Sequence, residues 1–293
     1  MKGPPVKEKI RTHVEQLFMN IPPHEIQSIA EGFRAIWLDF EPKSIGGIKA
    51  EDRQKQENVG APVEVLRAIG AETGKYTSQD VDGFLPLTVL LWNEFGREGR
   101  IVASAALGKM ELKNPKRVLP KIKSLCRSCI TWEDCDVLAM RALEPIVRKD
   151  PESWMPEMKS WLEDKNKWIQ RAGATVIGRL PMKRADLTEP CLKMLPPILN
   201  SPDRDVQRAV SFAIRLAARG DIKPVITFLD CQVPPGDPAV TWVLCDVIRS
   251  MTKRFLPEFK PLLPKYQTWA ADPALNPKDL RSIESAIKFL KNA

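Results

Sequence analysis

The chain has 293 residues, 43% of them hydrophobic and 28% charged, a composition that provides enough apolar material for a continuous core. Lysine and arginine (45) outnumber aspartate and glutamate (37), and the net charge of +8 favours a polyanionic partner. The only histidines are His13 and His24. This scarcity argues against a histidine triad or a histidine metal site, so any catalysis is expected to depend on a carboxylate.

The chain has no stretch that we expect to cross a membrane. The longest apolar run, residues 84–92, is too short for a bilayer and contains Pro86. The first 18 residues are charged and amphipathic, unlike a secretory signal. We therefore expect a cytoplasmic protein whose cysteines are free thiols.

Three cysteines, Cys126, Cys129 and Cys135, have a spacing that resembles part of a metal site. No fourth ligand lies nearby in the sequence, and buried free cysteines are the more common arrangement. We accordingly expect neither a metal nor a cofactor.

Helical periodicity recurs along almost the whole chain, and strand-like alternation is hard to find. The 26 prolines interrupt the pattern often, and proline is tolerated in the first turn of a helix but not in its interior. The pattern predicts helices at 7–20, 23–37, 63–73, 83–96, 98–110, 115–128, 132–149, 152–163, 166–179, 188–199, 203–219, 221–229, 238–254, 256–269 and 277–291. Residues 38–62, which contain Gly46, Gly47 and Gly60, are predicted to be a turn and a connecting loop.

A repeat is visible within these helices. Residues 168–172 (WIQRA) recur as 205–209 (DVQRA), and a weaker copy spans 136–142. The interval of roughly 35 residues is close to that of HEAT-type helical pairs, which stack because one pair cannot bury its own apolar face. The sequence thus predicts an all-α, HEAT-like helical-repeat solenoid, an α-α superhelix with a concave basic groove. We expect one domain over residues 1–293, with N-terminal helices and a loop at 1–55 and helical pairs at 56–293.

The strongest candidates for chemistry are Trp132 and Asp136. Their i,i+4 spacing places an indole and a carboxylate on one face of the predicted helix. Arg171 and the pair Phe212 and Arg215 occupy similar places in successive repeats, so all of them are candidates to line one groove. Packing in the core, or pairing of Asp136 with an arginine of a neighbouring repeat, is the structural alternative.

A basic segment directly precedes the predicted Trp132 helix. Residues 109–127 contain seven lysines and arginines and a single acid, Glu111. Lys116, Arg117 and Lys121 are the candidates to contact phosphates, which supplies affinity without reading sequence. A solvated helix face explains the same run equally well when it is considered alone.

Three segments, in order, resemble the AlkD-type family of DNA alkylation-repair glycosylases: residues 131–136 (TWEDCD), 166–172 (NKWIQRA) and 207–215 (QRAVSFAIR). Residues 47–53 (GIKAEDR) and 91–110 add weaker matches, so the resemblance covers roughly residues 25–230. It implies a HEAT-like fold and the removal of N3- and N7-alkylated purines from duplex DNA.

The resemblance also implies roles for individual residues. Trp132 and Asp136 match the family's aromatic residue and carboxylate, and Arg171 and Arg215 match its DNA-backbone arginines. Phe212 stands where the family has a second tryptophan, which puts the rate, the substrate range or the activity itself in doubt. The implied partner is duplex DNA containing alkylated bases, bound by a monomer.

The expected chemistry fits these residue types. An N-alkylated purine is cationic, so it leaves as a neutral base without a general acid, and a carboxylate stabilises the positive charge that develops on the sugar. Aromatic faces attract cationic groups. Two other hypotheses remain open: a DNA-binding HEAT protein that recognises damaged duplex without cutting it, and a protein-binding HEAT scaffold.

Overall fold

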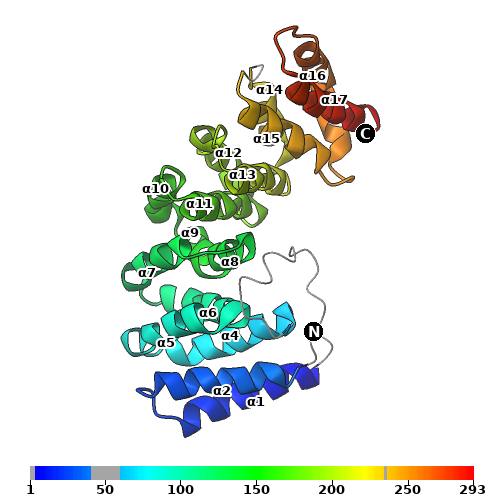
Figure 1. Cartoon of the computed structure of the whole chain (residues 1–293). Coiled ribbons are helices and arrows are strands. Elements are labelled where there is room, and N and C mark those ends of the chain that lie inside the picture. Colours follow the sequence, from blue (N-terminus) through cyan, green and yellow to red (C-terminus); the bar gives the residue numbers. More distant parts are fainter. Residues whose placement is uncertain (1–3, 41–59, 234–235) are drawn as a thin grey trace. The chain divides into compact units, whose positions relative to one another are not determined.

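The structure is a computed structural model that describes residues 4–40, 60–233 and 236–293, drawn in Figure 1. The chain divides into two compact units, Met1–Lys149 and Asp150–Ala293. Throughout the described ranges the regular elements are helices, without strands, as the sequence predicts. None of these helices has both the length and the apolar character needed to cross a membrane.

The first unit is built of two layers of helices. It contains α1 (Pro4–Asn20), α2 (Ile26–Leu38), α4 (Val63–Thr77), α5 (Val81–Glu94), α6 (Gly96–Glu111), α7 (Pro115–Arg127), α8 (Trp132–Leu138), a π-helical segment (Ala139–Leu143) and α9 (Glu144–Lys149). In one layer α1, α4, α6 and α8 pack in succession, and in the other α2 packs on α5 and α5 on α7 (Figure 1). Consecutive helices therefore alternate between the layers, as in a helical repeat.

The second unit repeats this arrangement. It contains α10 (Pro151–Leu162), α11 (Lys167–Arg179), α12 (Thr188–Lys193), α13 (Arg204–Ala217), α14 (Ile222–Asp230), α15 (Pro238–Arg249), α16 (Leu263–Ala270) and α17 (Pro277–Lys291). Helices α11, α13, α15 and α17 pack in succession, while α12 packs on α14. The predicted all-α helical-repeat fold is confirmed.

Asparagine and aspartate caps explain where many helices begin. An Asn or Asp side chain accepts a hydrogen bond from a first-turn backbone N–H, which satisfies a donor that has no partner within the helix. In four helices the residue after the cap is a proline, whose missing N–H costs nothing there. The caps of these four helices are Asn114, Asp150, Asp237 and Asn276.

The structure departs from the predicted helices in several places, among them 238–254, which ends at Arg249. The predicted helix 132–149 contains the π-helical segment, and the predicted helix 188–199 ends at Lys193 before a 3₁₀ turn at Pro196–Ile198. The predicted helix 256–269 begins as a 3₁₀ helix, Leu256–Leu262. Proline explains the last two, because it cannot donate to the carbonyl four residues earlier. The predicted loop at 38–62 falls mostly, and the segment 47–53 entirely, outside the described residues.

Gly108 allows α6 to approach the π-helical segment closely. A Cβ atom at this position would lie 1.9 Å from the carbonyl oxygen of Arg141. We expect Gly108→Ala to lower the free energy of unfolding by about 1–3 kcal/mol, because backbone atoms must move apart. Gly236→Ala is the matched control, since its Cβ would meet nothing within 4 Å. Equal stability of the two variants in urea unfolding would contradict this packing.

Glu111, near the end of α6, is fully buried, and its carboxylate oxygens have no hydrogen-bond partner among the described residues. Burial raises the pKa of Glu111 well above its ordinary value. The folded state therefore binds this proton more tightly than the unfolded state, and the associated stability is lost as pH rises from the unfolded pKa through the folded pKa.

We expect Glu111→Gln to remove this part of the pH dependence. The measurement is the free energy of unfolding in urea at a series of pH values above about 4.3, the ordinary glutamate pKa. The exposed Glu258→Gln serves as the control and should keep the wild-type slope. An unchanged slope in Glu111→Gln would contradict the prediction.

Candidate functional site

Helix α8 carries Trp132 and Asp136 on one face, one turn apart. Its N-terminus is fixed by a capping box: the Thr131 hydroxyl accepts from the Asp134 N–H at 3.3 Å, and the Asp134 carboxylate accepts from the Thr131 N–H at 3.0 Å. The Trp132 side chain is 36% exposed, whereas Asp136 is 8% exposed. The indole is therefore accessible, and the carboxylate is more enclosed than an open groove would suggest.

Two buried arginines of α6 hold the residues that follow Trp132. Arg97 forms a bidentate pair with Glu133, with N–O distances of 2.7 and 2.9 Å. Arg100 contacts the Asp134 carboxylate at 2.6 Å and also donates to the carbonyl of Trp92. A guanidinium group that makes two parallel hydrogen bonds to a carboxylate fixes the orientation of that carboxylate as well as its distance. These contacts join the first turn of α8, which includes the backbone of Trp132, to the previous repeat.

Sequence reasoning did not single out Arg97 and Arg100. Their partners lie 36 and 34 residues further along the chain, close to the repeat interval. The sequence does contain a signal for this pairing. Two arginines lie three residues apart at the start of one helix, and two consecutive acids, Glu133 and Asp134, lie at the start of a later helix. In stacked repeats such positions face each other.

Of the predicted phosphate contacts, Lys116 and Arg117 lie at the start of α7, the end away from Trp132, and Lys121 lies in the middle of the helix. Arg117 pairs with Asp82 of α5 at 2.6 Å. Together with Lys121 it lines a hollow of about 640 Å³ whose other walls are α2 and α5. Lys116 is exposed next to Arg117. From Arg117 to the end of α7 at Arg127 the helix rises about 15 Å, so the structure does not bring Lys116 or Arg117 to the start of α8.

Arg171 lies on α11 and is almost fully buried. Its Nη1 donates to the backbone carbonyl of Asp205, at the start of α13, at 2.8 Å. Lys167, one turn earlier, pairs with the carboxylates of Asp205 at 3.1 Å and Asp203 at 3.4 Å. These contacts fix Arg171 against the next repeat.

Phe212 and Arg215 lie together on α13, and both side chains are half-buried. The Arg215 guanidinium stands 5.4 Å from the centre of the Phe212 ring, within the range of a cation–π contact. Its Nη1 donates to the carbonyl of Ser250 at 3.1 Å. Burial lowers the pKa of Arg215, but an arginine stays charged at neutral pH. The structure confirms the pairing on one helix and leaves its contact with DNA a prediction.

Trp132 and Asp136 belong to the first unit, whereas Arg171, Phe212 and Arg215 belong to the second. Each set has a defined geometry within its own unit. Their alignment along one groove remains a prediction from the sequence.

The cysteines are free thiols, five of them buried and Cys231 exposed. Burial raises the pKa of Cys126 and Cys129, and it raises the pKa of Cys191 to about 12. A buried thiol with a raised pKa is a poor nucleophile. Among the described residues, no group of three or more His, Cys, Asp or Glu side chains has the arrangement of a metal site.

Comparison with known proteins gives a family match and likenesses to solved structures. The family model described as DNA alkylation repair enzyme matches residues 40–235. The crystal structure of smu.31 from Streptococcus mutans UA159 is similar with a TM-score of 0.53 and 15% identity, covering 65% of this chain and 98% of that one. At this identity the likeness shows the fold alone.

A designed armadillo repeat protein in complex with a (KR)4 peptide also matches, with a TM-score of 0.32 and 15% identity over 96% of this chain and 99% of that one. That score is too low to support an argument. No curated protein matches the chain.

Proposed function

This chain belongs to the DNA alkylation repair enzyme family, and from that premise we propose that it is a DNA glycosylase that excises alkylated purines. Family membership makes DNA its partner and the repair of alkylated DNA its role. The proposal adds the reaction: hydrolysis of the N-glycosidic bond of cationic N3- or N7-alkylpurines in duplex DNA.

One observation carries the proposal. An accessible indole, Trp132, stands one helical turn from a carboxylate, Asp136, on a helix whose first turn is fixed by a capping box and by two buried arginine pairs. A rigid support is what a catalytic pair needs, since small displacements cost large factors in rate. An aromatic face and a carboxylate both attract the positive charge, which lies on the alkylated base before the bond breaks and develops on the sugar as it breaks.

The reaction follows from this pair. The C1′–N9 bond of an alkylated purine breaks with both electrons going to the base, which becomes neutral, and positive charge develops on the sugar. The Asp136 carboxylate stabilises that charge and orients a water molecule. The water oxygen bonds to C1′, and its proton is released. The products are a free alkylated base and an abasic site.

Arg171 and Arg215 complete the proposal as DNA-backbone contacts, with Lys116, Arg117 and Lys121 as more distant phosphate contacts. Such contacts position DNA without reading its sequence. Their contribution should decline steeply as salt rises.

The test is the release of 7-methylguanine or 3-methyladenine from methylated duplex DNA by the purified protein. An unmethylated duplex of the same sequence is the control for background. Release that depends on methylation supports a glycosylase. Salt-dependent binding of the duplex without any released base would favour the alternative of a damage-recognition protein that does not cut.

The phenylalanine at Phe212 favours this alternative, because a phenyl ring attracts a cation more weakly than the indole of the family's tryptophan. We expect Phe212→Trp to raise the rate of base release by about two- to fivefold, the effect of a modest gain in cation–π attraction for the positive charge that develops on the sugar. Phe255→Trp is the matched control, since Phe255 is also half-buried and lies 5.5 Å from the guanidinium of Arg254. Equal rates in the two variants and the wild type would show that Phe212 does not contact the lesion.

A further inference from the structure

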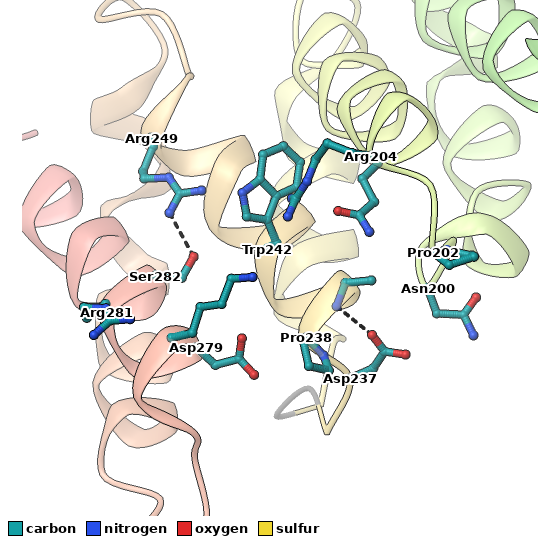
Figure 2. A pocket seen from close by; sticks show the side chains of 13 residues that line it. Asn200, Pro202, Arg204, Asp237, Pro238, Trp242, Arg249, Asp279, Arg281 and Ser282 are labelled. Carbon is teal, nitrogen blue, oxygen red and sulfur yellow. Dashed lines mark hydrogen bonds between the residues drawn. The ribbon is translucent and has the colours of Figure 1, made fainter. Parts of the chain in front are cut away.

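The second unit contains a pocket of about 560 Å³ between the start of α13, the exposed side of α15 and the start of α17. Figure 2 shows Trp242 in its wall, with Arg204 beside the indole and Arg249, Asp279 and Arg281 toward α17. The volume is typical of a site for a small ligand. Several of its lining residues, Trp242 among them, follow residue 235, where the family match ends.

The charged groups of this pocket favour an anion. Four cationic side chains line it, against two carboxylates. Both carboxylates already serve as hydrogen-bond acceptors at helix starts: Asp237 accepts from the N–H groups of Ala239 and Val240, and Asp279 accepts from the amide of Asn276. The cations are Arg204, Arg249, Lys278 and Arg281.

Trp242 and Arg204 together form a flat surface among these cations, which we call the Trp242–Arg204 platform. Trp242 is half-buried, and the Arg204 guanidinium lies 4.2 Å from the centre of its ring. Indole and guanidinium planes are the surfaces on which proteins stack nucleic-acid bases. A site for phosphate alone does not need this platform.

Gln207 forms a fixed part of the pocket wall. This residue lines the pocket, is 5% exposed, and donates from Nε2 to the Ser201 carbonyl at 2.8 Å. That bond fixes the orientation of the amide, and Oε1 is then buried without a partner among the described residues. A buried acceptor without a donor is costly.

We propose that this pocket binds one nucleotide of a DNA strand at a distance from the excised base. The phosphate contacts Arg249, Lys278 and Arg281, and the base stacks on the Trp242–Arg204 platform. The proposal rests on the proposed function only in taking DNA as the ligand. It adds a subsite whose main residues lie beyond the part of the chain that matches the family.

The first test removes the phosphate contacts. Lys278→Gln with Arg281→Gln is compared with Lys288→Gln with Lys291→Gln, which removes the same charge from exposed positions on the same helix. Affinity for an undamaged, fluorescently labelled duplex is measured between about 50 and about 200 mM salt. We expect the pocket variant to bind about tenfold more weakly and to lose about one unit of the slope of log K against log salt, while the control pair stays within about twofold of the wild type.

The second test removes the base platform. Trp242→Leu should weaken binding about tenfold, because stacking is lost, while leaving the salt slope unchanged. Circular dichroism checks that each variant is folded. Titration with deoxyadenosine monophosphate distinguishes a DNA strand from a free nucleotide as the ligand. If both pocket variants lose saturable binding of the mononucleotide but bind the duplex as the wild type does, the pocket binds a free nucleotide.

Two outcomes overturn the proposal. In the first, both pocket variants bind duplex and mononucleotide as the control pair does. In the second, only the charge variant weakens binding, so that the site holds phosphate without a base. Base release from methylated duplex is measured separately, so a failure of this subsite is distinguishable from a failure of the glycosylase proposal.

Discussion

Asp136→Asn is expected to lower the single-turnover rate of base release by about 10²–10³-fold, the loss found when one electrostatic contact to a developing charge is removed. The substitution keeps the size of the side chain and removes its negative charge. Because the phosphate contacts are unchanged, affinity for the duplex should stay within about threefold of the wild type. The measurement pairs single-turnover release of the methylated base with duplex binding at one salt concentration.

Glu258→Gln is the control for this experiment, since it removes a negative charge from an exposed position. It should release the base at the wild-type rate. If Asp136→Asn did the same, the carboxylate would have no role in the chemistry. If base release and duplex binding fell by the same factor, Asp136 would instead have a structural role in the DNA-binding surface.

Arg100→Met is expected to lower the free energy of unfolding by about 3–5 kcal/mol, because it leaves a buried carboxylate without its cation. The side chains of Arg100 and Asp134 are 10% and 3% exposed, and their N–O distance is 2.6 Å. Methionine preserves much of the volume, so the change isolates the charge. The measurement is urea unfolding of each variant.

The chain provides a matched control in Arg117→Met. Arg117 and Asp82 also pair at 2.6 Å, but their side chains are 59% and 69% exposed. An exposed pair of this type contributes less than about 1 kcal/mol. Equal losses in the two variants would mean that burial does not govern the strength of these pairs, and that Arg100 does not hold the start of α8 as described.

The helices could be predicted well because their signals are local. Proline after an Asn or Asp cap marks the start of four helices, and the apolar period marks the body of the helix. The π-helical segment after Asp136 could not be predicted in this way. It packs against Gly108 of the preceding repeat, and no local pattern records such a close approach.

The candidate site was predictable in part for the same reason. The i,i+4 relation of Trp132 and Asp136 is local, and the structure confirms that both residues lie on one helix. The Arg100–Asp134 pair depends on a contact between repeats. Lys116 and Arg117 are near Trp132 in sequence, but the intervening length of α7 separates them in space.

The most direct test of the central claim is the identity of the two products formed from a duplex that contains one 7-methylguanine. Mass spectrometry of the DNA strand and of the released small molecule distinguishes breakage of the glycosidic bond from removal of the alkyl group. A glycosylase gives free 7-methylguanine and a strand with an abasic site, in equal amounts. An intact strand carrying unmodified guanine, or an unaltered methylated strand, would contradict the account.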